Sequence, residues 1–391
     1  MVAASRVNLA DMERVTLGAP AAEAVARLAE QRDARRVFIL AGSTLNRTTD
    51  EVRKIEAALG ERHAATHDGM RAHSPRGDVL AAARVARDYD ADLVVTVGGG
   101  SVTDAGKVIP LCLKHGIAAH DDFEAFRNRV SEDGTGFHPT FEGPDVRVIA
   151  VPTTLSGGEF NALAGVTDEA TRLKQGYEHR RMAPAAVVLD PAITVHTPGW
   201  VWLSTGVRAV DHCAETLGSL RSNAFCDGMA ESGLRLLARG LARSKDEPGD
   251  LEARLECQVG AWQSMIPVVG GVALGASHAI GHVLGGTCDV PHGYTSCVMT
   301  PFVQAWNAPA NAERQRRISS ALGDAERPAA ELLDGLIRGL GMPRSLREVG
   351  IGEDQLPLIA TNTLQDYWSR TNPRPIHGVE AVMEILRSAL R

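Results

Sequence analysis

Aromatic residues are scarce in this sequence. They account for 4% of the 391 residues, whereas 44% of the residues are hydrophobic and 39 are glycine. Such an aliphatic, glycine-rich composition disfavours a β-sandwich and favours buried strands mixed with helices. The chain is long enough for two domains, each with its own hydrophobic core. We therefore expect a two-domain α/β protein.

Paired cysteines and an N-terminal apolar segment are also absent from the sequence. The cysteines lie far apart, without a C-x-x-C pair, at Cys112, Cys213, Cys226, Cys257, Cys288 and Cys297. This spacing indicates neither a zinc site nor a disulfide framework. The start of the chain, MVAASRVNLADMERV, lacks the apolar stretch of a secretory signal. We expect free thiols and a cytoplasmic protein.

Basic residues form no block anywhere in the chain. The formal net charge is -7 and the sequence pI is about 6.0, so we expect neither a nucleic-acid nor a membrane partner. The segment from Cys257 to Cys288 contains no Asp, Glu, Lys or Arg and is longer than a membrane span requires. Because it also holds Pro267, two histidines and seven glycines, we expect a buried helix that faces an active site.

The first half of the chain alternates between two kinds of segment. Helical patterns such as TDEVRKIEAALGE and RGDVLAAARVARDYD lie between short apolar runs. These runs are Arg35 to Gly42, Ala91 to Gly100, Val146 to Thr154 and Ala185 to Pro191. Strands alternating with helices predict βαβ units and a parallel sheet. A charged, glycine-containing segment over residues 119–144 interrupts the alternation and is expected to be a surface excursion near the active-site cleft.

After residue 191 the strand-like runs stop and long amphipathic patterns follow. Examples are GLRLLARGLAR, NAERQRRISSALG, AAELLDGLIRGLG and GVEAVMEILRSALR. Their spacing is typical of helices that bury one face. We predict an α/β domain with a parallel sheet over residues 1–191, followed by an all-helical domain over residues 192–391.

The strongest local motif is TVGGGSVTDAGK, Thr96 to Lys107. Glycines directly after a buried strand let a ligand approach the backbone, and the following helix presents N–H groups and its positive dipole end to an anion such as a diphosphate. The motif fits neither common nucleotide pattern, because G-x-G-x-x-G fails at Thr103 and a P-loop needs a glycine at Ser101 and a hydroxyl at Val108. On its own it is equally a tight turn between a strand and a helix.

Several motifs together resemble the iron-containing alcohol dehydrogenase family in order and spacing. They are GGGSVTDAGK, VPTTLSGGEF followed by VTD and Lys174, LDP, STGVRAVDHCAETLGS, ASHAIGHVLGGTCDVPHG and TNPRP. The resemblance extends from about Arg35 to the C-terminus, and TNPRPI and TTLSGGEF are most similar to the maleylacetate reductase branch. It implies a dinucleotide-binding N-terminal domain, a helical C-terminal domain and a nicotinamide in the cleft between them.

The resemblance also implies which residues bind the cofactor. By this resemblance the diphosphate would be bound by Gly98, Gly99, Gly100 and Ser101, and Asp104 would stabilise the turn. The nicotinamide side would be bound by Thr153, Thr154 and Ser156, and the ribose hydroxyls by Lys174. Members that prefer NAD usually carry an aspartate after the VFILAG strand, where this chain has Gly42 and Ser43. Without that carboxylate a 2′-phosphate is not repelled, so NADH and NADPH both remain expected cofactors.

The family's metal ligands are only partly matched. Metal-using members carry an aspartate and, four residues later, a histidine, and this chain has Arg208 and His212 at those positions. A guanidinium has no lone pair to give and repels a dication. The family's two further ligands match His278 and His292. The only ligands left for a metal would then be the imidazoles of His212, His278 and His292. Asp211 is a poor substitute, because it points about 100° away from His212 on a helix.

We therefore expect no metal. In its place, Arg208 is expected to grip a substrate carboxylate, while His212, His278 and His292 provide hydrogen bonds and proton transfer around the bound anion. His282 matches the family's cleft histidine near the nicotinamide and is the candidate proton donor.

The predicted function is an NAD(P)H-dependent reduction of a small oxo acid, most like the maleylacetate reductases of aromatic-compound degradation, by a homodimer. One alternative is a metal-dependent alcohol dehydrogenase or aldehyde reductase with altered ligands. Another is a lyase similar to dehydroquinate synthase, but such lyases keep several cleft lysines and Lys245 is the only lysine after Pro191. A non-catalytic binding protein is disfavoured, because so many of the polar residues in the family's motifs are present at the matching positions of this sequence.

Overall fold

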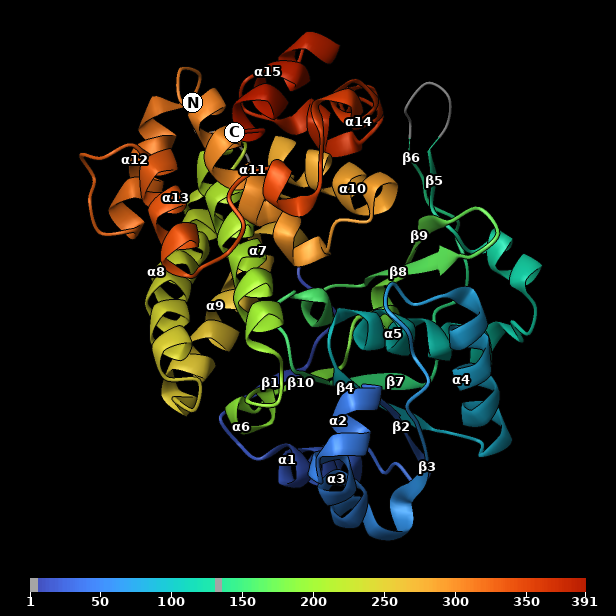
Figure 1. Cartoon of the computed structure of the whole chain (residues 1–391). Coiled ribbons are helices and arrows are strands. Elements are labelled where there is room, and N and C mark those ends of the chain that lie inside the picture. Colours follow the sequence, from blue (N-terminus) through green and yellow to red (C-terminus); the bar gives the residue numbers. More distant parts are fainter. Residues whose placement is uncertain (1–5, 131–135) are drawn as a thin grey trace. The chain divides into compact units, whose positions relative to one another are not determined.

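The computed structural model describes residues 6–130 and 136–391. It divides into two compact units (Figure 1). One unit spans Ala10–Thr197, and the other spans Pro198–Arg391 together with residues 6–9. The predicted boundary between residues 191 and 192 lies slightly earlier, inside helix α6 (Pro191–Thr194).

The unit Ala10–Thr197 is built on a six-stranded sheet, in which every neighbouring pair of strands is parallel. The order across the sheet is β1-β10-β7-β4-β2-β3. The strands are β1 (Arg14–Leu17), β2 (Val37–Ala41), β3 (His63–His67), β4 (Leu93–Gly98), β7 (Arg147–Pro152) and β10 (Ala186–Leu189). The predicted parallel sheet is confirmed, and the four apolar runs form β2, β4, β7 and β10.

Helices cover both faces of this sheet because successive side chains of a strand point to opposite faces. Phe38 and Leu40 of β2 join one hydrophobic core with α4 (Arg76–Asp88) and α5 (Gly100–His115). Val37 and Ile39 of the same strand join the other core with α1 (Ala21–Gln31) and α3 (Glu51–Leu59). The short helix α2 (Ser43–Thr48) follows β2 directly. The arrangement presents the carboxyl end of β4 to the start of α5, where the glycine motif lies.

Four other strands form two antiparallel hairpins that sequence patterns did not predict. They are β5 (Arg129–Val130) with β6 (Gly136–Phe137), and β8 (Leu163–Asp168) with β9 (Leu173–Glu178). The first hairpin lies in the 119–144 excursion, of which residues 131–135 fall outside the described part. Lys174 lies on β9, opposite Thr167. The predicted excursion therefore contains a little regular structure, and its position near a cleft stays a prediction.

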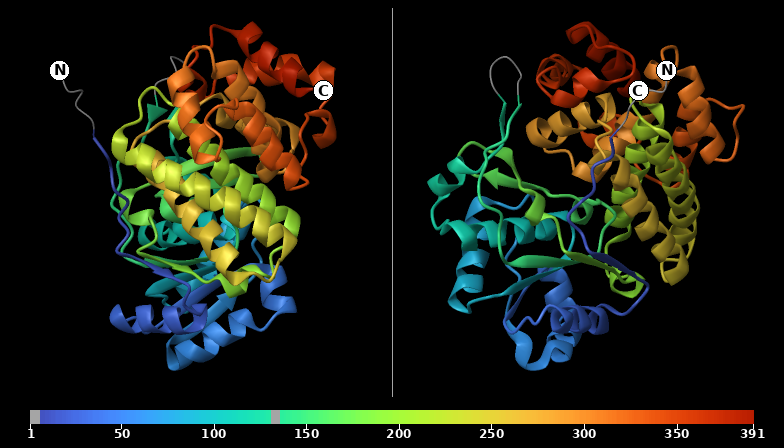
Figure 2. Two further views of the ribbon diagram at one scale, coloured as in Figure 1. Left: turned by 90° about the vertical axis from the view of Figure 1, so that its left-hand side faces the viewer. Right: turned by 180° about the vertical axis from the view of Figure 1, so that it is seen from behind.

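The second unit is helical, as predicted, and residues 198–391 contain no strand. Its helices are α7 (Gly199–Gly218), α8 (Ala224–Asp246), α9 (Leu251–Val269), α10 (Ala276–Cys288), α11 (His292–Asn307), α12 (Ala312–Ala321), α13 (Ala329–Gly339), α14 (Leu356–Thr363) and α15 (Val379–Ala389). Figure 2 shows α8 and α9 running side by side.

Short 3-10 helices occur in both units. They are η1 (Gly60–Arg62), η2 (His120–Ala125), η3 (Gly158–Phe160), η4 (Arg180–Met182), η5 (Arg347–Val349), η6 (Glu353–Gln355) and η7 (Tyr367–Thr371).

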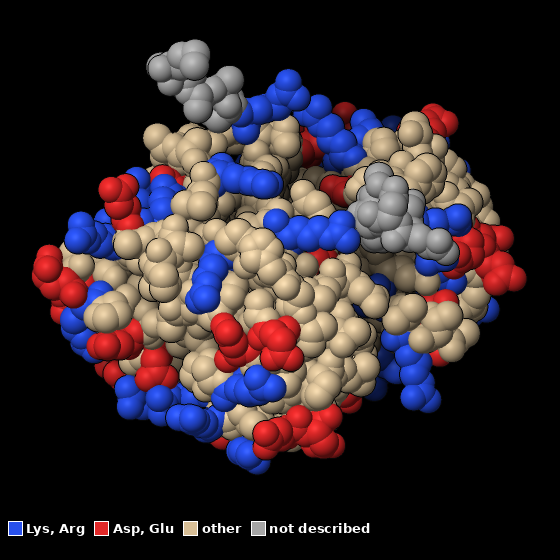
Figure 3. All heavy atoms as spheres, turned by 90° about the horizontal axis from the view of Figure 1, so that it is seen from above, with Lys and Arg blue, Asp and Glu red and all other residues tan. Residues whose placement is uncertain are grey.

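The charge-free segment from Cys257 to Cys288 is not one continuous helix. It contains the second part of α9 and all of α10, with a break after Val269. In the described part of the chain, no helix has both the length and the apolar character needed to cross a bilayer. The cysteines are free thiols, as predicted. Basic and acidic side chains are interspersed over the face in Figure 3, in line with the sequence, which has no basic block.

Candidate active site

The glycine motif forms the junction between β4 and α5. Gly98 ends the strand, Gly99 is the N-cap of the helix, and no side chain caps the helix start. Further along the helix, a Cβ on Gly106 would lie 2.0 Å from Cγ2 of Thr96 on the strand, so only glycine permits this close packing. The start of α5 is therefore fixed firmly against the sheet, with backbone N–H groups available to an anion.

The loop after β7 meets this junction. A Cβ on Gly99 would lie 3.0 Å from Cγ2 of Thr154, and a Cβ on Gly100 would lie 3.2 Å from Oγ of Ser156. The hydroxyls of Thr154 and Ser156 are 2.8 Å apart and share a hydrogen bond. Thr153, at the end of the same strand, is buried. Two motifs about fifty residues apart in sequence thus form one surface, because β4 and β7 are neighbours in the sheet.

Ser101 and Asp104 are engaged by other residues. Ser101 Oγ accepts a hydrogen bond from the backbone N–H of His73 at 2.9 Å, so one of the hydrogen bonds that this hydroxyl can make stabilises the fold. Asp104 lies between two lysines, with Oδ2 at 3.3 Å from Nζ of Lys174 and Oδ1 at 3.2 Å from Nζ of Lys107. The structure therefore gathers all the predicted cofactor residues, and their binding roles stay predictions.

Lys107 is a member of this site that the sequence analysis passed over. Its side chain is completely buried, and its ammonium donates to the carbonyl oxygens of Gly158 and Leu163 as well as approaching Asp104. These contacts tie α5 to the loop that follows Ser156. A buried lysine with several acceptors is a strong constraint on that loop.

The residues of this unit fit a dinucleotide. A Cβ on Gly99 or Gly100 would enter the space between the loop and the helix start. Because these two glycines have no side chain, the backbone there stays accessible. Hydroxyls from Thr154 and Ser156 line the same place, and they can bind an amide or a sugar without adding charge near a hydride. Gly98 to Ser101 would hold the diphosphate, and Lys174 would reach the ribose.

Glu159, in the loop held by Lys107, makes a pH-dependent contribution to stability. Burial raises the pKa of its carboxyl from 4.5 to about 7. The folded protein holds this proton more tightly than the unfolded chain does. The resulting stabilisation is full below pH 4.5 and is lost as the pH rises through about 7.

We expect Glu159→Gln to remove this loss, because glutamine mimics the protonated acid. The urea midpoint should equal that of the unchanged protein below about pH 5 and exceed it near pH 8. If the urea midpoints of the unchanged protein and of Glu159→Gln fell equally between these pH values, the raised pKa of Glu159 would not be the cause of the loss.

In the helical unit, α7 presents its polar residues on adjoining faces. Arg208, Asp211 and Glu215 occur at spacings of three and four residues, and His212 lies beside them. All four are at most 7% exposed. Charged residues are seldom buried this deeply without partners, so these four residues of α7 form a candidate site.

Asp211 and Glu215 meet His278 of α10. His278 Nδ1 lies 2.8 Å from Oε2 of Glu215 and 3.2 Å from Oδ2 of Asp211. Hydroxyls of Ser277 and Ser296 donate to the same Asp211 oxygen at 2.7 and 2.8 Å. Asp211 is therefore part of this cluster, although its direction relative to His212 alone had made it a poor candidate. Residues 211 and 215 share the face of α7 that contacts His278.

His212 makes a different contact. Its ring stacks on that of His278, with centroids 4.7 Å apart and an angle of 22° between the planes. Its Nδ1 lies 3.4 Å from the hydroxyl of Ser264 on α9. Burial, together with the neighbouring His278 and Arg208, lowers the pKa of His212 well below its ordinary value.

Burial decides the charges of this cluster. It lowers the pKa of His278 to about 3 and that of Arg208 to about 10, and it raises the pKa of Glu215 to about 7. Both imidazoles are therefore neutral at neutral pH, and Arg208 remains a cation that Asp211 and Glu215 attract. Even so, Nη1 of Arg208, Oδ1 of Asp211 and Nε2 of His278 are buried without a hydrogen-bond partner.

Among the described residues, one group of three His, Cys, Asp or Glu side chains could hold a metal ion, and it is Asp211, Glu215 and His278. The predicted set of His212, His278 and His292 does not form such a group. Carboxylate oxygens and an imidazole suit several divalent cations, so the expected absence of a metal is not supported. Arg208 opposes a dication there through its charge, and both oxygens of Glu215 already accept backbone N–H groups.

The other histidines lie together. Nδ1 of His282 is 2.8 Å from Oδ2 of Asp366, and its ring lies on Trp368 with centroids 4.8 Å apart. The rings of His282 and His292 are nearly parallel, with centroids 6.2 Å apart. Trp368 also contacts His278 edge-on at 5.7 Å, so it links the buried pair of histidines to this half-exposed pair.

A parallel-sheet unit with a glycine loop between β4 and α5, together with a helical unit that holds a buried histidine cluster, is typical of an NAD(P)-dependent oxidoreductase. Residues 13–191 match the iron-containing alcohol dehydrogenase family, and residues 202–390 match the C-terminal part of the Fe-containing alcohol dehydrogenase family. The chain belongs to this family.

Relatives at about 30% identity include dehydrogenases and maleylacetate reductases. The chain is 33% identical to Dehydrogenase ALT3 of Alternaria alternata, over 90% of this chain and 98% of the relative. It is 28% identical to Maleylacetate reductase 1 of Cupriavidus pinatubonensis, over 97% and 95%. The crystal structure of maleylacetate reductase from Agrobacterium tumefaciens matches 99% of both chains with a TM-score of 0.83 and 26% identity.

Proposed function

We propose that this oxidoreductase reduces a small oxo acid, with maleylacetate as the model substrate. The observation that carries the proposal is Arg208, whose guanidinium is buried with Nη1 unpartnered. An unsatisfied buried guanidinium nitrogen is costly, and a bound carboxylate removes that cost with charge-assisted hydrogen bonds. The similarity to maleylacetate reductases supports the same substrate class.

The chain's residues then divide the work. The reduced nicotinamide, when bound at the glycine loop, supplies a hydride. Arg208 orients the substrate carboxylate, and the neutral imidazoles of His212 and His278 offer hydrogen bonds without repelling it. His282 supplies the proton: because its Nδ1 bonds to Asp366, Nε2 is the nitrogen left for the substrate.

Both NADH and NADPH are proposed as cofactors. β2 ends at Ala41, and a Cβ on Gly42 would meet only Val97 O at 3.8 Å and Gly98 Cα at 4.0 Å. The Cβ of a side chain at residue 42 would therefore meet only ordinary van der Waals contacts. Comparable KM values for NADH and NADPH, and a loss of NADPH activity in Gly42→Asp, would support this proposal. Strict NADH use by the unchanged protein would contradict it.

The substrate class is tested by following nicotinamide oxidation with maleylacetate and with its uncharged diester. We expect kcat/KM for the acid to exceed that for the diester by on the order of 10²-fold, because only the acid pairs with Arg208. Equal values, or activity confined to uncharged aldehydes, would refute the carboxylate proposal.

A metal-dependent alcohol dehydrogenase or aldehyde reductase is the second candidate, and the group Asp211, Glu215 and His278 favours it. The two candidates differ in metal content and in sensitivity to a chelator. Stoichiometric zinc or iron by elemental analysis, with activity lost on chelation and restored by the metal, would establish the second. We expect neither, since Arg208 supplies the positive charge at this place.

A further inference from the structure

The segment Asp366–Arg374 contacts the start of α10, the helix that carries His278 and His282. Thr371 donates a hydrogen bond from its hydroxyl to the carbonyl of Leu274. Asn372 Oδ1 accepts the backbone N–H of Ala276 at 3.0 Å. Because Gly275 has no capping side chain, Asn372 satisfies an N–H group at the helix start from a distant part of the sequence.

The amide of Asn372 is held in one orientation. Its Nδ2 donates to Oδ1 of Asn307 at 2.6 Å and to the carbonyl of Arg374 at 2.8 Å, and its Oδ1 accepts from Nδ2 of Asn307 at 3.1 Å. Arg374 in turn lies over the ring of Trp306 at 4.1 Å. Asn372 therefore connects α10 to the end of α11 through a buried and fully bonded amide.

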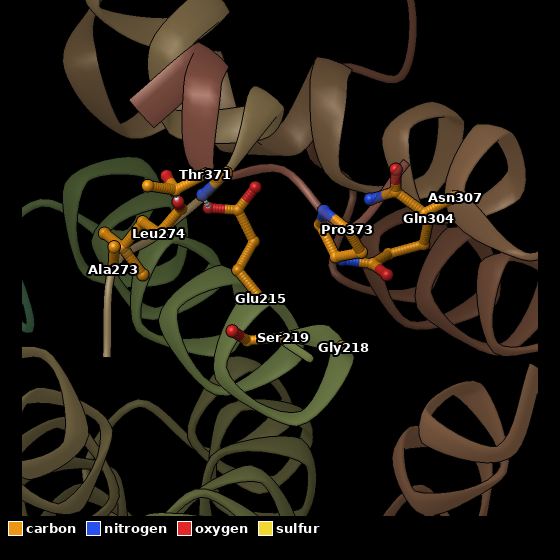
Figure 4. Close-up of a pocket in the computed structure, with 10 residues that line it drawn as sticks. Glu215, Gly218, Ser219, Ala273, Leu274, Gln304, Asn307, Thr371 and Pro373 are labelled. Carbon is orange, nitrogen blue, oxygen red and sulfur yellow. Dashed lines mark hydrogen bonds between the residues drawn. The ribbon is translucent and has the colours of Figure 1, made fainter. Parts of the chain in front are cut away.

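Glu215 completes this arrangement from α7. Its Oε2 accepts the N–H of Gly275 at 2.9 Å and its Oε1 accepts that of Ser277 at 2.8 Å. Three consecutive N–H groups at the start of α10 are thus bound by two side chains. Figure 4 shows Glu215 pointing from α7 toward Leu274, with Thr371 on that side and Asn307 reaching in from α11. These residues line a shallow crevice together with Gly218, Ser219 and Gln304.

The same segment also fixes the histidine side chains. Asp366 bonds Nδ1 of His282 and is itself fixed by accepting the N–H of Trp368 at 2.9 Å. The ring of Trp368 contacts both histidines of α10. One short stretch therefore holds the backbone of Leu274 and Ala276 and contacts the side chains of His278 and His282.

We propose that Asn372 and Asp366 are positioning residues for the reduction, acting through α10 and His282 without touching the substrate. This inference rests on the proposed function, in which His282 supplies the proton and His278 a hydrogen bond. A displacement of reacting groups by about 1 Å can lower a rate by on the order of 10²-fold. Loss of the bond from Asn372 should therefore appear in kcat and leave cofactor affinity unchanged.

The experiment compares Asn372→Leu, Asn372→Asp and the control Asn311→Leu. Asn311 is also buried, but its amide donates to the carbonyl of Gly218 at 2.8 Å and accepts from Nε2 of Gln315 at 3.1 Å, and neither partner belongs to α10. We expect Asn372→Leu to lower kcat by on the order of 10-fold to 10²-fold with little change in KM, and Asn311→Leu to keep kcat. Asn372→Asp keeps an acceptor for Ala276 and should retain more kcat than leucine. It also serves as the test variant if the leucine variant does not fold.

Asp366→Asn should likewise lower kcat, because an amide no longer binds Nδ1 of His282 as a charged acceptor does. An unchanged kcat in folded variants of both residues would overturn the proposal. So would an equal loss in Asn311→Leu, which would show a general effect of removing a buried amide.

Hydrogen exchange separates this inference from the proposed function, since it needs no substrate. The backbone N–H groups of residues 275–277 should exchange at least about 10-fold faster in Asn372→Leu than in Asn311→Leu. Faster exchange together with no turnover of any oxo acid would refute the proposed function and keep the role of the segment in holding α10. Unchanged exchange would overturn the role of Asn372 whatever the substrate.

Discussion

Arg208→Ala is expected to raise the KM for a dicarboxylate substrate by on the order of 10²-fold, and far less for an uncharged analogue. The guanidinium is buried and Nη1 has no partner in the protein, so a substrate carboxylate is its expected ligand. Loss of such a charge-assisted pair costs roughly 2 to 4 kcal/mol. Steady-state kinetics with maleylacetate and its diester measure the difference directly.

The matched variant for this prediction is Arg208→Lys, which keeps the charge but loses the planar pair of donors. We expect it to recover part of the affinity, because an ammonium attracts a carboxylate without gripping it in two places. If alanine raised both KM values equally, Arg208 would act through the fold. Glu215 and Asp211, which attract its charge, would then be its true partners.

Gly99→Val is expected to abolish dinucleotide binding while the protein remains folded. A Cβ at this position meets Cγ2 of Thr154 at 3.0 Å, a side chain that can shift by the small distance required. The branched side chain then occupies the place where the diphosphate approaches the start of α5. We expect the Kd for NADH to rise by at least about 10²-fold, as measured by quenching of protein fluorescence.

Gly335→Ala is the control for this glycine. It lies in α13, and a Cβ there meets nothing within 4 Å. This variant should bind NADH unchanged and unfold at the same or a slightly higher temperature, since alanine favours a helix. Normal NADH affinity in a folded Gly99→Val protein would remove the loop from the cofactor site.

The central part of the fold could be predicted from the sequence because its strands are buried on both faces. Val94 and Val95 of β4, for example, join opposite cores, and every residue of the strand is buried. The edge strand β3, with the sequence HAATH, is only half buried and gave no apolar pattern. Hairpin β8–β9 was missed for a similar reason, since Leu173 and Lys174 are exposed.

The candidate site was predictable where its residues lie close together in sequence. Glu215 could have been found as well, because it follows Asp211 by one helical turn on α7. Asp366 and Asn372 could not, since their partners His282 and Ala276 precede them by 84 and 96 residues. Contacts over such distances depend on how α10 and the C-terminal segment fold together, which no local pattern contains.

The most direct test of a reduction that depends on Arg208 and not on a metal is the rate of NADH oxidation by protein freed of metal. Purified protein is treated with a chelator, its metal content is measured, and the rate is recorded with maleylacetate and with an uncharged aldehyde. If Arg208 carries the charge that orients the substrate, the metal-free protein should keep full activity with the acid and show little with the aldehyde. Activity that disappears with the metal, and returns when zinc or iron is added, would contradict it.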